Sequence, residues 1–170
     1  MNADQLREIQ APLKQRYRDD PTSAVIRMSA QGSVSTNEVA CQVQTCQGTT
    51  IAGLHSAAGG DGTQACSVDM LLQSLVACSG VTLAAVATAL SIPLQSAQIL
   101  AEAELDFRGT LGVDRAAPVG IVSLWLNFQI ASPADDGQLS KLVELTERYC
   151  VVLRTLAEPA TVKAVWTRRV

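Results

Sequence analysis

The sequence of 170 residues is poor in aromatic and charged residues. Aromatic residues make up 4% of it, charged residues 17%, and there is one histidine. The net charge of −3 lacks the basic excess of nucleic-acid-binding proteins, so we expect no nucleic-acid partner. Low charge and a hydrophobic fraction of 48% exclude intrinsic disorder. The length fits one domain, with a core of Ala, Val, Leu and Ile.

The N-terminal twenty residues lack the apolar stretch of a secretory signal peptide. We therefore expect a cytoplasmic protein whose cysteines are mostly thiols. The five cysteines are an odd number, so they cannot all pair within one chain. They are Cys41, Cys46, Cys66, Cys78 and Cys150. Cys41 and Cys46 have Cys-x4-Cys spacing, but on a strand their side chains would point to opposite faces, and no other pair is close enough in sequence to form a zinc-ligand pair. We therefore predict no metal and no other cofactor.

The longest apolar stretch, from Met70 to Leu94, contains no Lys or Arg. Polar residues interrupt it, and no basic residue marks a cytoplasmic end as in a membrane span. We expect this stretch to form a helix that is buried on most sides within the fold, without membrane contact.

The apolar periodicity predicts three helices and six strands. The helices are expected at residues 3–18, 67–90 and 138–149, and the strands at 24–30, 38–46, 49–55, 99–109, 119–130 and 161–169. Hairpins dominate this order, so we expect an α+β fold with a largely antiparallel sheet and helices on one face. Residues 1–20 would form an N-terminal helix and residues 21–170 a single domain.

A glycine-rich segment, residues 56–64, precedes the long helix. It lacks the lysine of a phosphate-binding Walker loop, so we interpret it as a connection. Ser67 is the expected N-cap of the helix. Asp69 would lie in the first turn, where the helix dipole favours a carboxylate.

Cys78 and Cys150 lie on the apolar stripes of the two later helices. Two interpretations remain open on pattern alone. The thiols could be small buried hydrophobic groups, or they could approach each other within disulfide range on packed helices.

Three segments of the sequence resemble the OsmC/Ohr family of osmotically inducible and organic-hydroperoxide-resistance proteins. The family's central helix with its cysteine is similar to CSVDMLLQSLVACSGVTLAAVATAL. Its strand that ends in a glycine turn is similar to LDFRGTLGV, and its second helix with the second cysteine is similar to LSKLVELTERYCVV. These segments are residues 66–90, 105–113 and 139–152. Their order and spacing extend the resemblance over residues 24–169.

The resemblance implies a fold and a mechanism. The fold would be an intertwined homodimer with an antiparallel sheet packed on two central helices. Cys78 would be the reactive cysteine of a stress-response peroxidase, oxidised by an organic hydroperoxide to a sulfenic acid. Cys150 would condense with it to a disulfide, which an external dithiol would reduce. An apolar pocket would bury the alkyl part of the substrate.

The group that would activate Cys78 is not evident from the sequence. The best-characterised branch of the family has a Glu ten residues before the reactive cysteine, paired with an Arg, but position 68 here is Val. The supporting candidates are Asp69, Arg27 and His55. An alternative function is therefore a stress-related or small-ligand-binding protein of the same fold with little peroxidase turnover.

Overall fold

The computed structural model describes residues 1–45, 47–158 and 160–168. Its helices are α1 (Ala3–Asp19), α2 (Ser67–Ala89), α3 (Phe107–Thr110), α4 (Asp136–Tyr149) and α5 (Val151–Ala157). Its strands are β1 (Gly32–Val34), β2 (Ala40–Thr45), β3 (Gly48–Gly53), β4 (Ala65–Cys66), β5 (Ser96–Leu105) and β6 (Ile121–Ala131). The predicted α+β class is confirmed.

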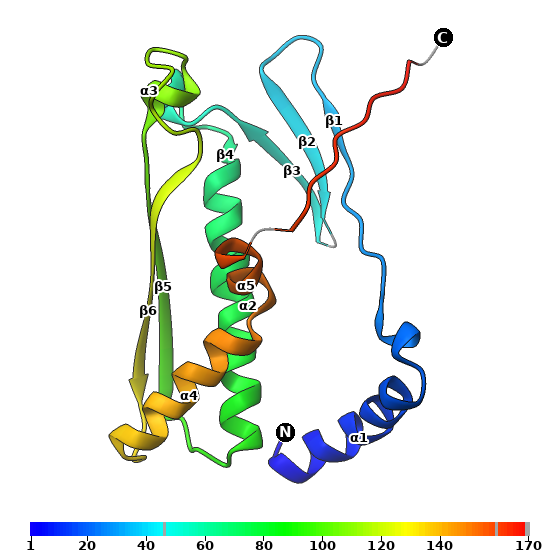
Figure 1. Ribbon diagram of the computed structural model, residues 1–170. Coiled ribbons are helices and arrows are strands. Elements are labelled where there is room, and N and C mark those ends of the chain that lie inside the picture. Colours follow the sequence, from blue (N-terminus) through cyan, green and yellow to red (C-terminus); the bar gives the residue numbers. More distant parts are fainter. Residues whose placement is uncertain (46, 159, 169–170) are drawn as a thin grey trace.

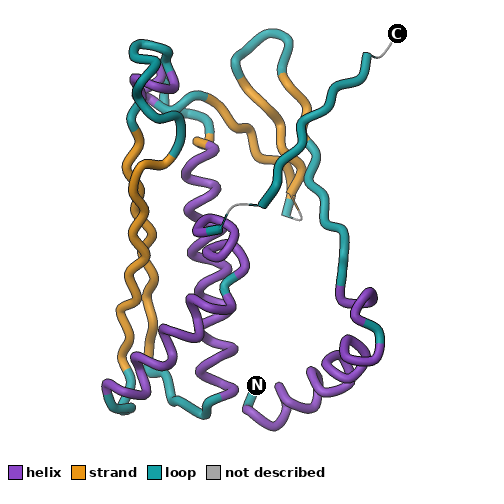
Figure 2. Tube along the Cα trace, viewed as in Figure 1, coloured by secondary structure: helices purple, strands orange, loops and turns teal. Residues whose placement is uncertain are grey.

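The strands form two sheets with α2 between them (Figure 1). The first sheet has the order β1-β2-β3-β4, antiparallel except for the short β3–β4 pair, and the second is the long antiparallel β5–β6 hairpin. Helices α2 and α4 pack together, and α2 also packs against β5 (Figure 2).

The buried core lies where α2, α4 and the β5–β6 hairpin meet. It consists of Leu83, Ala87, Ile92 and Leu142, surrounded by half-buried side chains that include Ile99 and Phe128. Small residues on α2 let the neighbouring elements approach closely, as expected for a core with few aromatic side chains.

Side-chain caps determine where two of the three longer helices begin. Asn2 and Gln5 form a capping box at α1, and Asp135 and Gln138 form one at α4. The prediction that Ser67 caps α2 was wrong. Cys66 occupies the N-cap position and makes no side-chain cap hydrogen bond, while Asp69 lies in the first turn as predicted.

Two predicted strands are absent from the described residues. Residues 25–30 and 161–168 are extended but belong to no strand, and Trp166 is 82% exposed. An extended segment becomes a strand only where a neighbouring strand pairs with it through hydrogen bonds, and among the described residues these segments have no such neighbour. The first sheet instead begins with β1. Cys46 and residue 169 of the predicted strands lie outside the described residues.

The predicted strand at residues 99–109 ends early because Asp106 caps the short helix α3. The Asp106 carboxylate accepts a hydrogen bond from the backbone N–H of Arg108 and forms an ion pair with its guanidinium. The side chain of Arg108 therefore stabilises the turn that leads from β5 towards β6.

Helix α2 is long and apolar enough to cross a membrane, by length and composition alone. Its mean hydropathy is 1.8 over 18 residues, and 22% of that window is buried. It packs against β5, α4 and α5 as a central helix. The prediction that it is buried on most sides was wrong for a single chain, because these elements cover only part of its surface.

Replacement of Leu142 tests the proposed core. Leu142 is 0% exposed, so Leu142→Ala should lower the free energy of unfolding by about 2–5 kcal/mol through lost burial and a cavity. Leu111→Ala, at a side chain that is 55% exposed, should change it by less than about 1 kcal/mol. Urea denaturation would measure both variants, and equal effects would contradict this assignment of the core.

Candidate functional site

Cys78 and Cys150 come together where α5 crosses the middle of α2 (Figure 1). Cys78 is half-buried on α2, and Cys150 is completely buried. Cys150 has extended backbone angles, φ −71° and ψ 107°, and is both the C-cap of α4 and the N-cap of α5. The chain thus breaks its helix at the residue that places the second thiol.

Burial alone would raise the pKa of the Cys78 thiol. Hydrogen bonds from the backbone N–H of Val152, the side chain of Cys150 and the backbone N–H of Val151 oppose this and lower the pKa below its ordinary value of 9.0. The first N–H groups of a helix have no acceptor within that helix. The break before α5 therefore supplies two backbone donors to the sulfur.

The hydroxyl of Thr82 is a further donor near Cys78. It has one proton, which it donates to the backbone carbonyl oxygen of Cys78 at 2.7 Å. It also lowers the pKa of the thiol when it turns to the sulfur. Since one proton cannot serve both acceptors, we assign the main stabilisation of the thiolate to the backbone donors.

The pKa of Cys150 shifts in the opposite direction. Burial raises it, and the neighbouring Cys78 raises it further, while the backbone N–H groups of Leu153 and Val152 act the other way. When one thiol of the pair ionises, it is therefore Cys78, and the proton retained on Cys150 is donated in a hydrogen bond to the Cys78 sulfur. This asymmetry suits one nucleophilic thiolate and one thiol held in reserve.

The three supporting candidates lie away from this pair. Asp69 is nine residues before Cys78, about 180° around the helix, and faces β5. Arg27 is exposed in the extended segment between α1 and β1, which Figure 1 draws apart from α2. His55 follows β3 and lies near the start of α2, whereas Cys78 lies in the middle of that helix. Their predicted supporting roles remain predictions.

His55 and Asp69 instead line a cavity of about 250 Å³ at the start of α2, together with Cys66. The ring of His55 stacks on Phe107 with 5.2 Å between the centroids. Its Nδ1 accepts a hydrogen bond of 3.0 Å from the backbone N–H of Ala57. A neutral His55 therefore carries its proton on Nε2.

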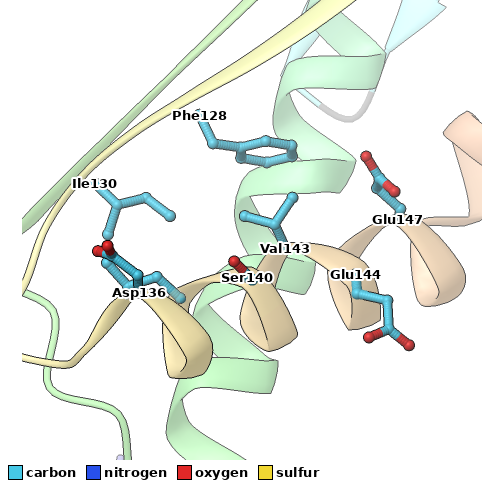
Figure 3. A pocket seen from close by; sticks show the side chains of 8 residues that line it. Phe128, Ile130, Asp136, Ser140, Val143, Glu144 and Glu147 are labelled. Atoms are coloured by element: carbon cyan, nitrogen blue, oxygen red, sulfur yellow. The ribbon is translucent and has the colours of Figure 1, made fainter.

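A larger, open cleft of about 730 Å³ lies between β6 and α4 (Figure 3). Phe128 and Ile130 of β6 and Val143 of α4 form its apolar part, and the carboxylates of Asp136 and Glu147 lie at its border. None of the four cysteines that the structure describes lines this cleft. Within the described residues, no group of three or more His, Cys, Asp or Glu side chains is arranged to hold a metal ion.

The two cysteines named from the sequence are in contact, and their redox roles stay predictions; the groups that lower the pKa of Cys78 were not predicted. These groups are backbone N–H donors of Val151 and Val152, which carry no side-chain signature. The residues after Cys150, VVLRTLA, continue a helical pattern and so conceal the break between α4 and α5. A search for charged side chains could not have found the donors.

Solved structures share this fold. An OsmC-like protein from Mycoplasma pneumoniae is 15% identical, with a TM-score of 0.65, and the match covers 79% of this chain and 89% of that one. An organic hydroperoxide resistance protein from Legionella pneumophila is 16% identical, with a TM-score of 0.62 and coverage of 79% and 93%. One from Bacillus subtilis is 16% identical, with a TM-score of 0.54 and coverage of 78% and 93%.

These identities are low and establish the fold alone. A comparison with curated proteins gives no match. The family model described as OsmC-like protein matches residues 60–165, which are more than half of the sequence and contain α2, both thiols and the β5–β6 hairpin. The chain belongs to the OsmC-like protein family.

Proposed function

We propose that the protein is a thiol-dependent peroxidase that reduces organic hydroperoxides. The observation that carries this proposal is the contact between Cys78 and Cys150, with the pKa of Cys78 lowered and that of Cys150 raised. A reactive thiolate next to a protonated thiol is the arrangement that two-step thiol oxidation requires. Several solved structures with this fold are named as organic hydroperoxide resistance proteins, which agrees with the proposal.

In the first step, the Cys78 thiolate attacks one oxygen of the O–O bond. The S–O bond forms, the O–O bond breaks, and the alcohol leaves after it takes a proton, so that Cys78 becomes a sulfenic acid. The Cys150 sulfur then attacks the sulfur of Cys78, and water leaves as the disulfide forms. An external dithiol reduces this disulfide by exchange and becomes a disulfide itself. These exchanges would take place in the cytoplasm.

We further propose that the protein acts as a homodimer. Most of α2 is unburied within one chain, and apolar side chains are exposed on it and on both extended segments. They are Leu71, Val81, Val25, Ile26, Met28, Val162, Val165 and Trp166. Exposed apolar surface of this extent marks an interaction surface, and a second copy would extend the same core.

A second candidate is a ligand-binding protein of this fold with little turnover. The observation that favours it is the placement of Asp69, Arg27 and His55, none of which lies beside Cys78. The thiolate would then be stabilised by backbone donors alone. The rate of Cys78 oxidation distinguishes the two functions.

Stopped-flow oxidation with cumene hydroperoxide tests the peroxidase function. The wild type should react at least about 100-fold faster than a free thiol, and Cys78→Ser should abolish this phase. Cys150→Ser should still form the sulfenic acid, detected by trapping with dimedone, but no intramolecular disulfide. Cys41→Ser is the control and should behave like the wild type. A wild-type rate equal to that of a free thiol would favour the ligand-binding candidate.

The pH dependence of alkylation tests how the thiolate is stabilised. Because the pKa of Cys78 is lowered, the rate of its alkylation by iodoacetamide should reach half its maximum below pH 9.0. Because the pKa of Cys150 is raised, the alkylation of Cys150 should reach half its maximal rate above pH 9.0. Val151→Pro removes one backbone donor at the first position of α5, after a residue whose extended angles suit a following proline. This variant should raise the midpoint of Cys78, which is the pH at which its alkylation reaches half its maximal rate. Peptide mass spectrometry would measure the alkylation.

Val151→Ala keeps the N–H group and is the matched control. It should leave the midpoint of Cys78 unchanged. If Val151→Pro and Val151→Ala give the same midpoint, the backbone N–H of Val151 does not stabilise the thiolate.

Light scattering tests the homodimer. The wild type should have the mass of two chains. The substitution Val81→Glu, in the middle of α2, should shift the measured mass towards that of a single chain. Val113→Glu is the matched control, because both valines are 73% exposed but Val113 lies in the turn after α3. A monomeric wild type, or equal behaviour of the two variants, would contradict this interface.

A further inference from the structure

The face of α2 opposite Cys78 borders two adjoining apolar hollows. The first is the cavity of about 250 Å³ near His55, and the second is a groove of about 460 Å³ between α2 and β5. They share Asp69 and Leu72 and therefore adjoin each other, and we refer to the two together as the depression. Cys78 and Cys150 line neither.

The charge in the lining of this depression is negative. With a neutral His55, Asp69 is the one charged group among all the residues that line the two hollows. The rest of the wall near it is apolar, and includes Leu72, Leu105 and Phe107. No lysine or arginine lines either hollow, so no lining side chain competes with a ligand for the carboxylate.

We propose that this depression binds a small ammonium compound with an apolar body. The ammonium group would bind the Asp69 carboxylate, where the two hollows join, through a charge-assisted hydrogen bond. The apolar body would occupy the cavity against Leu72, Leu105 and Phe107. A cavity of 150 Å³ accommodates a benzene ring, so about 250 Å³ accommodates a ring with a short side chain.

The opposite ligand charge fits this site poorly. A carboxylate or phosphate would face Asp69 with no lysine or arginine in the lining. A neutral apolar compound would gain the same burial but no charge-assisted hydrogen bond with Asp69, whose exposed carboxylate would stay hydrated. Charge complementarity therefore selects the ammonium over its alcohol and carboxylate analogues.

Three probes that share a phenyl ring and a short chain test this selection. They are phenethylamine, phenethyl alcohol and 3-phenylpropionate. NMR titration provides the measurement, because His55 is the single histidine and its ring Hε1 resonance belongs to a residue of the cavity wall. Phenethylamine should shift this resonance with a Kd about fivefold or more below that of the alcohol, and 3-phenylpropionate should bind weakest. Equal binding of the amine and the alcohol, or tighter binding of the carboxylate, would overturn the proposal.

Two variants locate the site. Asp69→Asn removes the charge and should weaken phenethylamine binding about fivefold, to the level of the alcohol. Ala103→Leu places a larger side chain in the cavity wall and should weaken binding of both the amine and the alcohol. Thermal melting would verify that each variant is folded.

Asp136→Asn is the matched control, since Asp136 is a first-turn carboxylate of α4 and lies in the other cleft. It should leave phenethylamine binding unchanged. Equal loss in Asp69→Asn and Asp136→Asn would mean that net charge, and not this site, attracts the amine, and would overturn the proposal. So would an Asp69→Asn variant that binds the amine as the wild type does.

Discussion

The packing of three elements against α2 is the constraint on which the rest of the structure depends. This helix of 23 residues has few polar side chains, and the β5–β6 hairpin, α4 and α5 each cover part of it. Leu83 and Ala87 of α2 meet Leu142 of α4 in the core, and this contact fixes the path of α4. The path of α4 in turn decides where Cys150 lies. The position of the second thiol therefore follows from hydrophobic packing.

The chemistry of the site depends on the break between α4 and α5. An uninterrupted helix would satisfy the N–H groups of Val151 and Val152 within itself. The extended backbone at Cys150 releases them, and they lower the pKa of Cys78 although burial opposes this. One residue thus supplies the second thiol and, through its backbone angles, the donors for the first.

The sequence predicts elements well where a side-chain pattern determines them and poorly where pairing between chain segments does. The N-terminal helix, α2, α4 and the β5–β6 hairpin have clear apolar patterns, and all were predicted. The strands expected at residues 24–30 and 161–169 have the right composition, but a strand also needs a neighbour, which a local pattern cannot reveal. Both thiols were identified, whereas the donors of α5 belong to the backbone.

In our proposals Asp69 and Cys78 have different roles because they lie on opposite faces of α2. A carboxylate beside a thiol raises the pKa of that thiol, so an acidic residue helps a reactive cysteine only through an intervening cation. The half turn between Asp69 and Cys78 separates the two charges with the body of the helix. Backbone N–H groups then stabilise the thiolate without placing a charged side chain beside it. In the proposed peroxidase, the hydroperoxide would therefore meet none of the side chains of Asp69, Arg27 and His55 beside the sulfur, and the backbone N–H groups would stabilise the attacking thiolate.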